Sequence, residues 1–71
     1  MNWRGFIVNK FVIKRNRKKM YVSHYFEFNG MIVPLFDDEL DYALVFENKK
    51  EAEKLLKILS KNFNSLVLQE I

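Results

Sequence analysis

The residues that could do acid, base or nucleophilic chemistry are few in this chain. His24 is the only histidine and there is no cysteine, which excludes disulfides, cysteine-ligated zinc and two-histidine metal sites. A nucleophile activated by His24 would have to be a nearby serine or threonine. The adjacent Ser23 belongs to the opposite face of the predicted strand, because successive side chains alternate. We therefore interpret His24 as an imidazole at the edge of the core, and the sequence predicts a protein that is not an enzyme.

Carboxylates form one dense cluster of like groups. Asp37, Asp38, Glu39 and Asp41 lie within one short segment, and hard cations prefer such oxygen ligands. The segment lacks the central glycine and the distal bidentate glutamate of a complete calcium loop. A solvated acidic loop is the favoured interpretation, and no metal or other cofactor is predicted. A row of carboxylates can also dock into a basic groove, which makes this loop a candidate for protein binding.

Basic residues gather at a predicted hairpin tip and along one strand face. They are Lys10, Lys14, Arg15, Arg17, Lys18 and Lys19. With Tyr21 and Tyr25 they are typical of a nucleic-acid footprint, in which cations contact phosphate and rings stack on bases. Lysines on exposed strands also prevent edge pairing and aggregation. Nucleic-acid binding is thus an alternative function, and a protected sheet is the alternative explanation of the same residues.

The formal charge changes sign along the chain. Residues 1–26 carry +7, residues 27–47 carry −6 and residues 48–71 carry +2, for a net charge of +3. Opposed basic and acidic regions steer partners and set the orientation of binding without necessarily adding much affinity. The acidic block would also repel phosphate, which counts against the nucleic-acid alternative.

Three strands are predicted before the helix. Segments 6–15 and 20–28 are dense in β-branched and aromatic residues, and the polar run 16–19 separates them as a hairpin turn. Asn29-Gly30 is the dipeptide that best tolerates a type I′ turn, so 31–36 is a third strand of a meander. Pro34 cannot donate to a ladder, which places this strand at an edge of the sheet or ends it there.

The two turns predict the same inner face. A two-residue turn at Asn29-Gly30 pairs Phe28 with Met31. At the first turn, either a two-residue loop, 17–18, or a four-residue loop, 16–19, pairs Arg15 with Met20. The predicted inner face contains Ile7, Phe11, Ile13, Val22, Phe26, Phe28, Met31, Val33 and Leu35. The predicted outer face contains Val8, Lys10, Val12, Lys14, Tyr21, Ser23, Tyr25, Glu27 and Ile32.

One helix and a last strand complete the predicted fold. Asn48 and Glu51 form a capping box before an amphipathic helix over 51–61, and 66–71 is a final strand. Residues 43–47 are expected to form a short strand after the acidic loop. The 71 residues therefore make a single domain, 1–71, of the α+β class. It is a two-layer sandwich, ββββαβ or βββαβ, with the helix on the inner face of an antiparallel meander.

One helix is too little to cover both faces of this sheet, so the outer face is expected to be exposed. An apolar and aromatic patch bordered by charge is typical of a protein interface, or of one half of a sheet-on-sheet homodimer. The residues assigned to protein binding are Asp37, Asp38, Glu39, Asp41, Tyr21, Tyr25, Ile32 and Phe36. Val8, Val12 and Trp3 belong to the same predicted surface.

The last third of the chain resembles a loose group of proteins. Segment 41–52 (DYALVFENKKEA), followed by an amphipathic helix and a strand ending Gln69-Glu70-Ile71, is similar to short uncharacterised proteins of phages and prophages of low-GC Gram-positive bacteria. The resemblance implies a non-enzymatic protein that binds and inhibits or redirects a host machine, anti-CRISPR proteins being one such class. It carries over no functional residues, because the group has no shared site motif.

The chain has no segment typical of a membrane protein. Its longest uncharged stretches are much shorter than the roughly 20 apolar residues that cross a bilayer, and 1–6 is not a signal-peptide hydrophobic run. The sequence therefore predicts a cytoplasmic protein without membrane contact. The expected partner is a host protein or a protein–nucleic acid complex.

Overall fold

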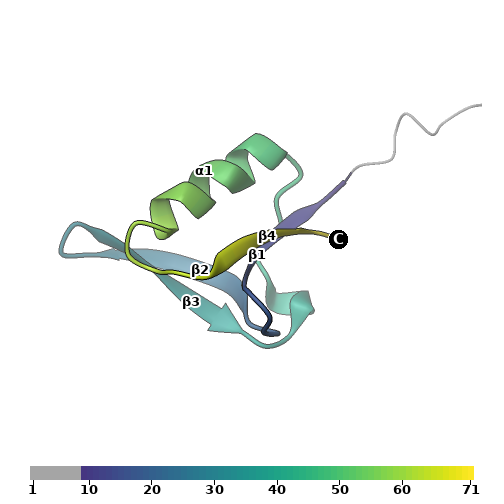
Figure 1. Cartoon of the computed structure of the whole chain (residues 1–71), viewed down its shortest axis with the longest axis horizontal. Helices are drawn as coiled ribbons and strands as arrows, with labels where there is room; N and C mark the ends of the chain where they lie inside the picture. The colour runs from purple at the N-terminus through teal and green to yellow at the C-terminus, as the bar shows by residue number, and fades with distance from the viewer. Residues whose placement is uncertain (1–8) are drawn as a thin grey trace, which may run out of the picture.

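The computed structural model describes residues 9–71 and shows one antiparallel sheet with one helix. The strands are β1 (Phe11–Arg15), β2 (Tyr21–Phe28), β3 (Met31–Asp37) and β4 (Leu66–Glu70). Their order in the sheet is β3-β2-β1-β4, and helix α1 (Lys49–Leu59) contacts β1, β3 and β4 (Figure 1). This confirms the predicted α+β class in its βββαβ form. It also confirms that the strand containing Pro34 lies at an edge.

The β2–β3 hairpin has the predicted turn and register. Asn29 and Gly30 have φ angles of 52° and 76°, the two positive values that a type I′ turn requires. Phe28 pairs with Met31, Phe26 with Val33 and His24 with Leu35, as the sequence predicts.

The β1–β2 connection is a four-residue loop, 16–19. The Arg15 N–H donates to the Met20 carbonyl over 2.9 Å, and only Arg17 within the loop has a positive φ. A two-residue type I′ turn needs two such residues, which excludes the shorter of the predicted alternatives.

Several predicted boundaries differ from the structure. Among the described residues β1 begins at Phe11, and the predicted strand residues 6–8 lie outside the described part. Residues 43–47 do not form the predicted strand: only Phe46 bridges Phe11, with two 2.8 Å backbone hydrogen bonds. The acidic segment leads into a short 3-10 helix, η2 (Leu40–Tyr42). Residues 44–46 therefore lie beside the start of β1, where β2 no longer pairs with β1.

A β-bulge in β2 decides which side chains face the helix. Val22 pairs with Phe36 but His24 pairs with Leu35, so Ser23 is one extra residue opposite β3. Because strand side chains alternate, an extra residue exchanges the two faces for the rest of the strand. Beyond Ser23, the side chains of His24, Phe26 and Phe28 therefore lie on the face away from α1, together with those of their β3 partners.

The core lies between α1 and the near part of the sheet. Ile13, Val22, Leu55 and Leu59 form its centre. Asn48 caps α1 as predicted: its Oδ1 accepts the N–H groups of Lys50 and Glu51 at 2.8 and 3.4 Å. Such a cap stabilises a helix by about 1 kcal/mol. The leucine stripe of α1 (Leu55, Leu56 and Leu59) packs against β1 and against the foot of β2, residues 21–23.

Candidate protein-binding surface

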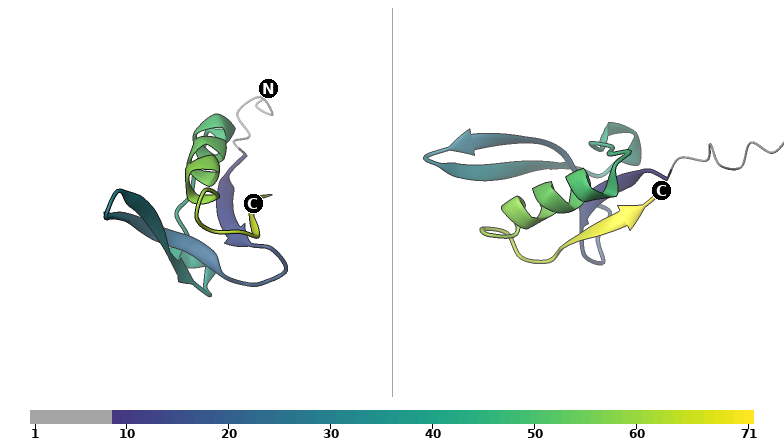
Figure 2. Two further views of the ribbon diagram at one scale, coloured as in Figure 1. Left: turned by 60° about the vertical axis from the view of Figure 1, so that its left-hand side comes forward. Right: turned by 90° about the horizontal axis from the view of Figure 1, so that it is seen from above.

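The far part of the β2–β3 hairpin, residues 24–35, forms an arm that α1 contacts on one side only. Both views in Figure 2 show the hairpin tip projecting away from α1. Every β2 residue from His24 onward is exposed. The β2 side of the arm thus carries exposed apolar side chains beyond the core.

One side of the arm is an exposed apolar surface, which we call the arm face. It consists of Phe26, Phe28, Met31, Val33 and Leu35, with His24 at its inner end. The exposed fractions are 44% for Phe26, 58% for Phe28, 38% for Met31 and 49% for Leu35. The cross-strand pairs between β2 and β3 place all six side chains on one face. The sequence predicts Phe26, Phe28, Met31, Val33 and Leu35 on the inner face under the helix, which is wrong, because the bulge at Ser23 turns them outward. Of these five, only Val33 is half-buried.

The outer face predicted from the sequence is largely closed near β1. Val12 is 0% exposed and Tyr21 is 6% exposed, so the prediction that they are accessible is wrong. Val12 and Tyr21 lie on the face away from α1, since Val12 alternates with Ile13 and Tyr21 pairs with Lys14. Val8 and Trp3 lie outside the described residues. The accessible part of this face is therefore the arm and not its near half.

Three other predicted binding residues lie on the helix side. Ile32 and Phe36 are half-buried and pack against the core cluster, which contradicts their predicted outward position. Tyr25 is 48% exposed, but its ring lines a hollow together with Leu55 and Ile58 of α1. The bulge at Ser23 accounts for all three, because it exchanges the two faces of the arm.

The acidic loop is accessible, with one carboxylate in a structural role. Asp38, Glu39 and Asp41 are exposed. Asp37 is half-buried, and its Oδ1 accepts the Glu39 N–H at 2.9 Å, which fixes the turn into η2. Asp37 also continues the row of Met31, Val33 and Leu35 at the foot of β3. Negative charge therefore borders one end of the arm face.

The basic residues and the two tyrosines do not form one continuous surface. Loop 16–19 and Arg15 are exposed, but Tyr21 is buried and Tyr25 belongs to the helix side. Tyr21 pairs with Asp37, so the basic loop and the acidic loop emerge at the same end of the sheet. The basic and acidic regions predicted from the sequence are therefore neighbours. This arrangement separates the cations from the stacking rings and places carboxylates beside them.

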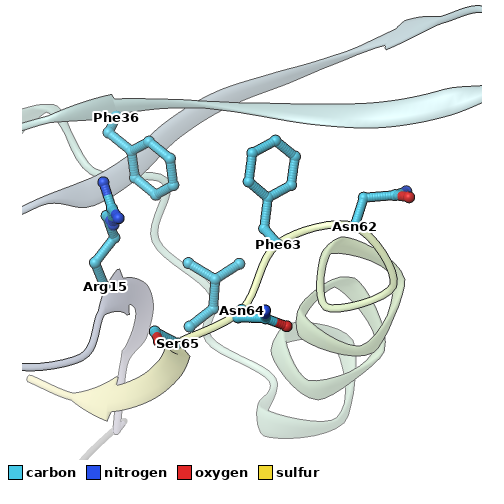
Figure 3. A pocket seen from close by; sticks show the side chains of 7 residues that line it. Arg15, Phe36, Asn62, Phe63, Asn64 and Ser65 are labelled. Carbon is cyan, nitrogen blue, oxygen red and sulfur yellow. The ribbon is translucent and has the colours of Figure 1, made fainter.

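Arg15 takes part in an open hollow at the end of α1. Its guanidinium carbon lies 5.7 Å from the centroid of the Phe36 ring, a cation–π contact. Figure 3 shows the Phe36 and Phe63 rings on either side of this hollow, with Arg15 below Phe36. The other lining residues are Asn62, Asn64, Ser65 and Leu66. The lining contains no histidine or carboxylate to activate Ser65, so the hollow lacks a catalytic pair.

The Ser23 hydroxyl is not directed to His24. His24 is exposed at the inner end of the arm face, opposite Leu35, and not at the core edge as predicted. Ser23 instead donates its hydroxyl to the Leu35 carbonyl at 3.3 Å. Within residues 9–71, no three histidine or acidic side chains gather as a metal site would require.

No protein-family model, curated protein or solved structure matches the chain. None of the helices in the described part of the chain has the length and apolarity needed to span a bilayer.

The exposure of the arm face could not be predicted from the alternation of residues, because one extra residue in β2 reverses that alternation. The one signal in the sequence was Ser23, the only small polar residue of β2.

Proposed function

We propose that this protein is a small non-enzymatic binding module that docks on another protein through the arm face. The observation that carries the proposal is the exposure of four large apolar side chains, Phe26, Phe28, Met31 and Leu35, on one side of a projecting hairpin. Side chains about half exposed present together on the order of 300–400 Å² of apolar surface. Patches of this size on a soluble domain mark interaction sites.

The charges around the arm face describe the partner. The arm face itself carries no charged side chain, while Asp38, Glu39 and Asp41 are exposed beyond its foot. A complementary partner surface is apolar at its centre and basic on one border. The apolar centre supplies the affinity, and the carboxylates fix the orientation.

The resemblance to phage and prophage proteins supports a host protein as that partner. A projecting hairpin can enter a groove of a larger protein or of a protein–nucleic acid complex and prevent its normal contacts. We therefore propose inhibition of a host machine as the consequence of binding. An anti-CRISPR role is one example of this class.

The test is a capture experiment with matched variants. The wild-type chain, the double variant Phe26→Ser/Phe28→Ser and the control Val45→Ser are used to capture partners from a bacterial lysate, and the captured protein is then purified and titrated. Val45 is 43% exposed and lies outside the arm. We expect the double variant to weaken binding at least about 100-fold, since two central aromatic residues are lost. Val45→Ser should bind like the wild type.

Equal binding by all three proteins would contradict the proposal. A further variant, Asp38→Asn/Glu39→Gln/Asp41→Asn, tests the orienting role of the acidic loop and should mainly slow association. Nucleic acid is titrated in parallel at about 50 mM salt, where phosphate contacts are strong. Tight binding there that falls steeply with added salt would instead support the nucleic-acid alternative.

A further inference from the structure

The two edges of the sheet differ in their capacity to accept another strand. In a hairpin closed by a type I′ turn, Phe28–Met31 is a hydrogen-bonded pair, which makes Tyr25–Pro34 a non-hydrogen-bonded pair. The nitrogen of Pro34 therefore points away from β2, towards the open edge. Since proline has no N–H, the β3 edge lacks a donor at the middle of the strand. The β3 edge is protected against pairing.

The β4 edge has no such protection. The Ser65 carbonyl accepts the Asn16 N–H at 2.6 Å and the Ile71 N–H donates to the Lys10 carbonyl at 2.8 Å. By alternation, residues 65, 67, 69 and 71 bond to β1, and the backbone groups of Leu66, Leu68 and Glu70 point outward. Within residues 9–71 these outward groups make no backbone hydrogen bond. The strand sequence LVLQE contains neither proline nor lysine.

We propose that β4 pairs with β4 of a second copy of this chain, in antiparallel orientation about a two-fold axis at Leu68. In this register each outward-pointing residue meets another, because Leu68 lies opposite its own counterpart and Leu66 opposite Glu70 of the second copy. Three such pairs form about six backbone hydrogen bonds. No two like charges meet, since each Glu70 lies beside a leucine.

A hollow beside β4 supports a second copy as the occupant. It is lined by Phe11, Leu68 and Glu70 of the sheet and by Lys49 and Glu53 of α1. Leu66 of the second copy lies opposite Glu70 on the helix side of the sheet, so its side chain enters this hollow and contacts Phe11 and Leu68. The two-fold axis repeats the contact on the other copy. The result is a continuous eight-stranded sheet with both helices on the same face (two copies of the four strands).

The test separates the β4 edge from the arm face, since this inference does not rest on the proposed function. Analytical ultracentrifugation from micromolar to millimolar concentration compares the wild type with Glu70→Pro and the control Glu70→Ala. Glu70→Pro removes an outward N–H and leaves the β1–β4 ladder intact, whereas Glu70→Ala removes the same carboxylate and keeps the N–H. Circular dichroism verifies that both variants are folded.

We expect a wild-type dimer whose dissociation constant rises about tenfold or more in Glu70→Pro and stays within about threefold in Glu70→Ala. Amide exchange should slow at Leu66, Leu68 and Glu70 as the concentration rises. A wild type that is monomeric at millimolar concentration would overturn the proposal. A dimer that survives Glu70→Pro, or that dissociates in Phe26→Ser/Phe28→Ser instead, would also overturn it.

Discussion

The body of the domain and the arm are built from similar residues but have different environments. The body comprises β1, the foot of β2, α1 and β4, and in the described part of the chain it holds all the buried hydrophobic residues other than proline. The arm is just as rich in aromatic and β-branched side chains, yet Pro34 is its one buried residue. Hydrophobicity alone therefore does not decide what is buried here.

This difference shows that the size of the core is limited by how much of the sheet the helix covers. Helix α1 has 11 residues and is about 16 Å long at 1.5 Å per residue, whereas the seven residues of β3 extend about 23 Å at 3.3 Å per residue. A helix of this length cannot cover the whole hairpin. The bulge at Ser23 then turns the more aromatic side of the uncovered part away from the helix.

The largest expected effect is on the body. Leu59 is 0% exposed and lies in the core cluster, so Leu59→Ala should lower the free energy of unfolding by about 2–5 kcal/mol. This is most of the stability of a domain of this size. Leu35→Ala on the arm face should cost less than about 1 kcal/mol, because Leu35 is 49% exposed. Chemical denaturation followed by circular dichroism measures both, and equal costs would abolish the distinction between body and arm.

An intermediate effect is expected from insertion of one alanine between Leu35 and Phe36, opposite Ser23. The inserted residue pairs with Ser23 and removes the bulge, so either the arm exchanges its two faces or the Val22–Phe36 pair is lost. Either outcome removes Ile32 or Phe36 from the core, at a cost of roughly 1–3 kcal/mol. NMR contacts between the Tyr25 ring and Ile58 should disappear. The control Ser23→Ala keeps the bulge and loses only the hydroxyl bond to Leu35, so unchanged contacts in both proteins would show that the bulge does not set the faces.

The smallest expected effect is on the tip of the arm. Gly30 has a φ of 76° and no atom within 4 Å of the position of an added Cβ, so Gly30→Ala carries a backbone cost only, about 1 kcal/mol. Amide exchange in the arm should accelerate while exchange in β1 and α1 stays constant. Asn29→Gly, which tolerates the same turn, should leave both regions unchanged. Equal acceleration in the body would mean that arm and body unfold as one unit.

Local features of the fold could be predicted because local chemistry specifies them. The Asn29-Gly30 turn, the Asn48 cap and the leucine stripe of α1 each depend on residues a few positions apart, and all three are confirmed. Pro34 placed its strand at an edge because a missing N–H is tolerated only there. Of the four acidic residues assigned to a loop, Asp38 and Glu39 lie in one, whereas Asp37 ends β3 and Asp41 lies in η2.

The candidate site could not be predicted, because its position depends on long-range geometry. Phe26, Phe28 and Met31 have the alternation of a core face, and one unpaired residue at Ser23 reversed their direction. Tyr21 appeared to be a surface ring, yet it is buried at the foot of β2.

The sequence by itself determined the class of fold, the Asn29-Gly30 turn and the strand partners next to that turn, since these follow from residue type and spacing. Only the tertiary structure decided which face of the arm meets α1, how far the helix reaches and which edge of the sheet stays open. Those properties depend on the pairing of β2 with both neighbours at once, and strand alternation makes every face sensitive to a single extra residue.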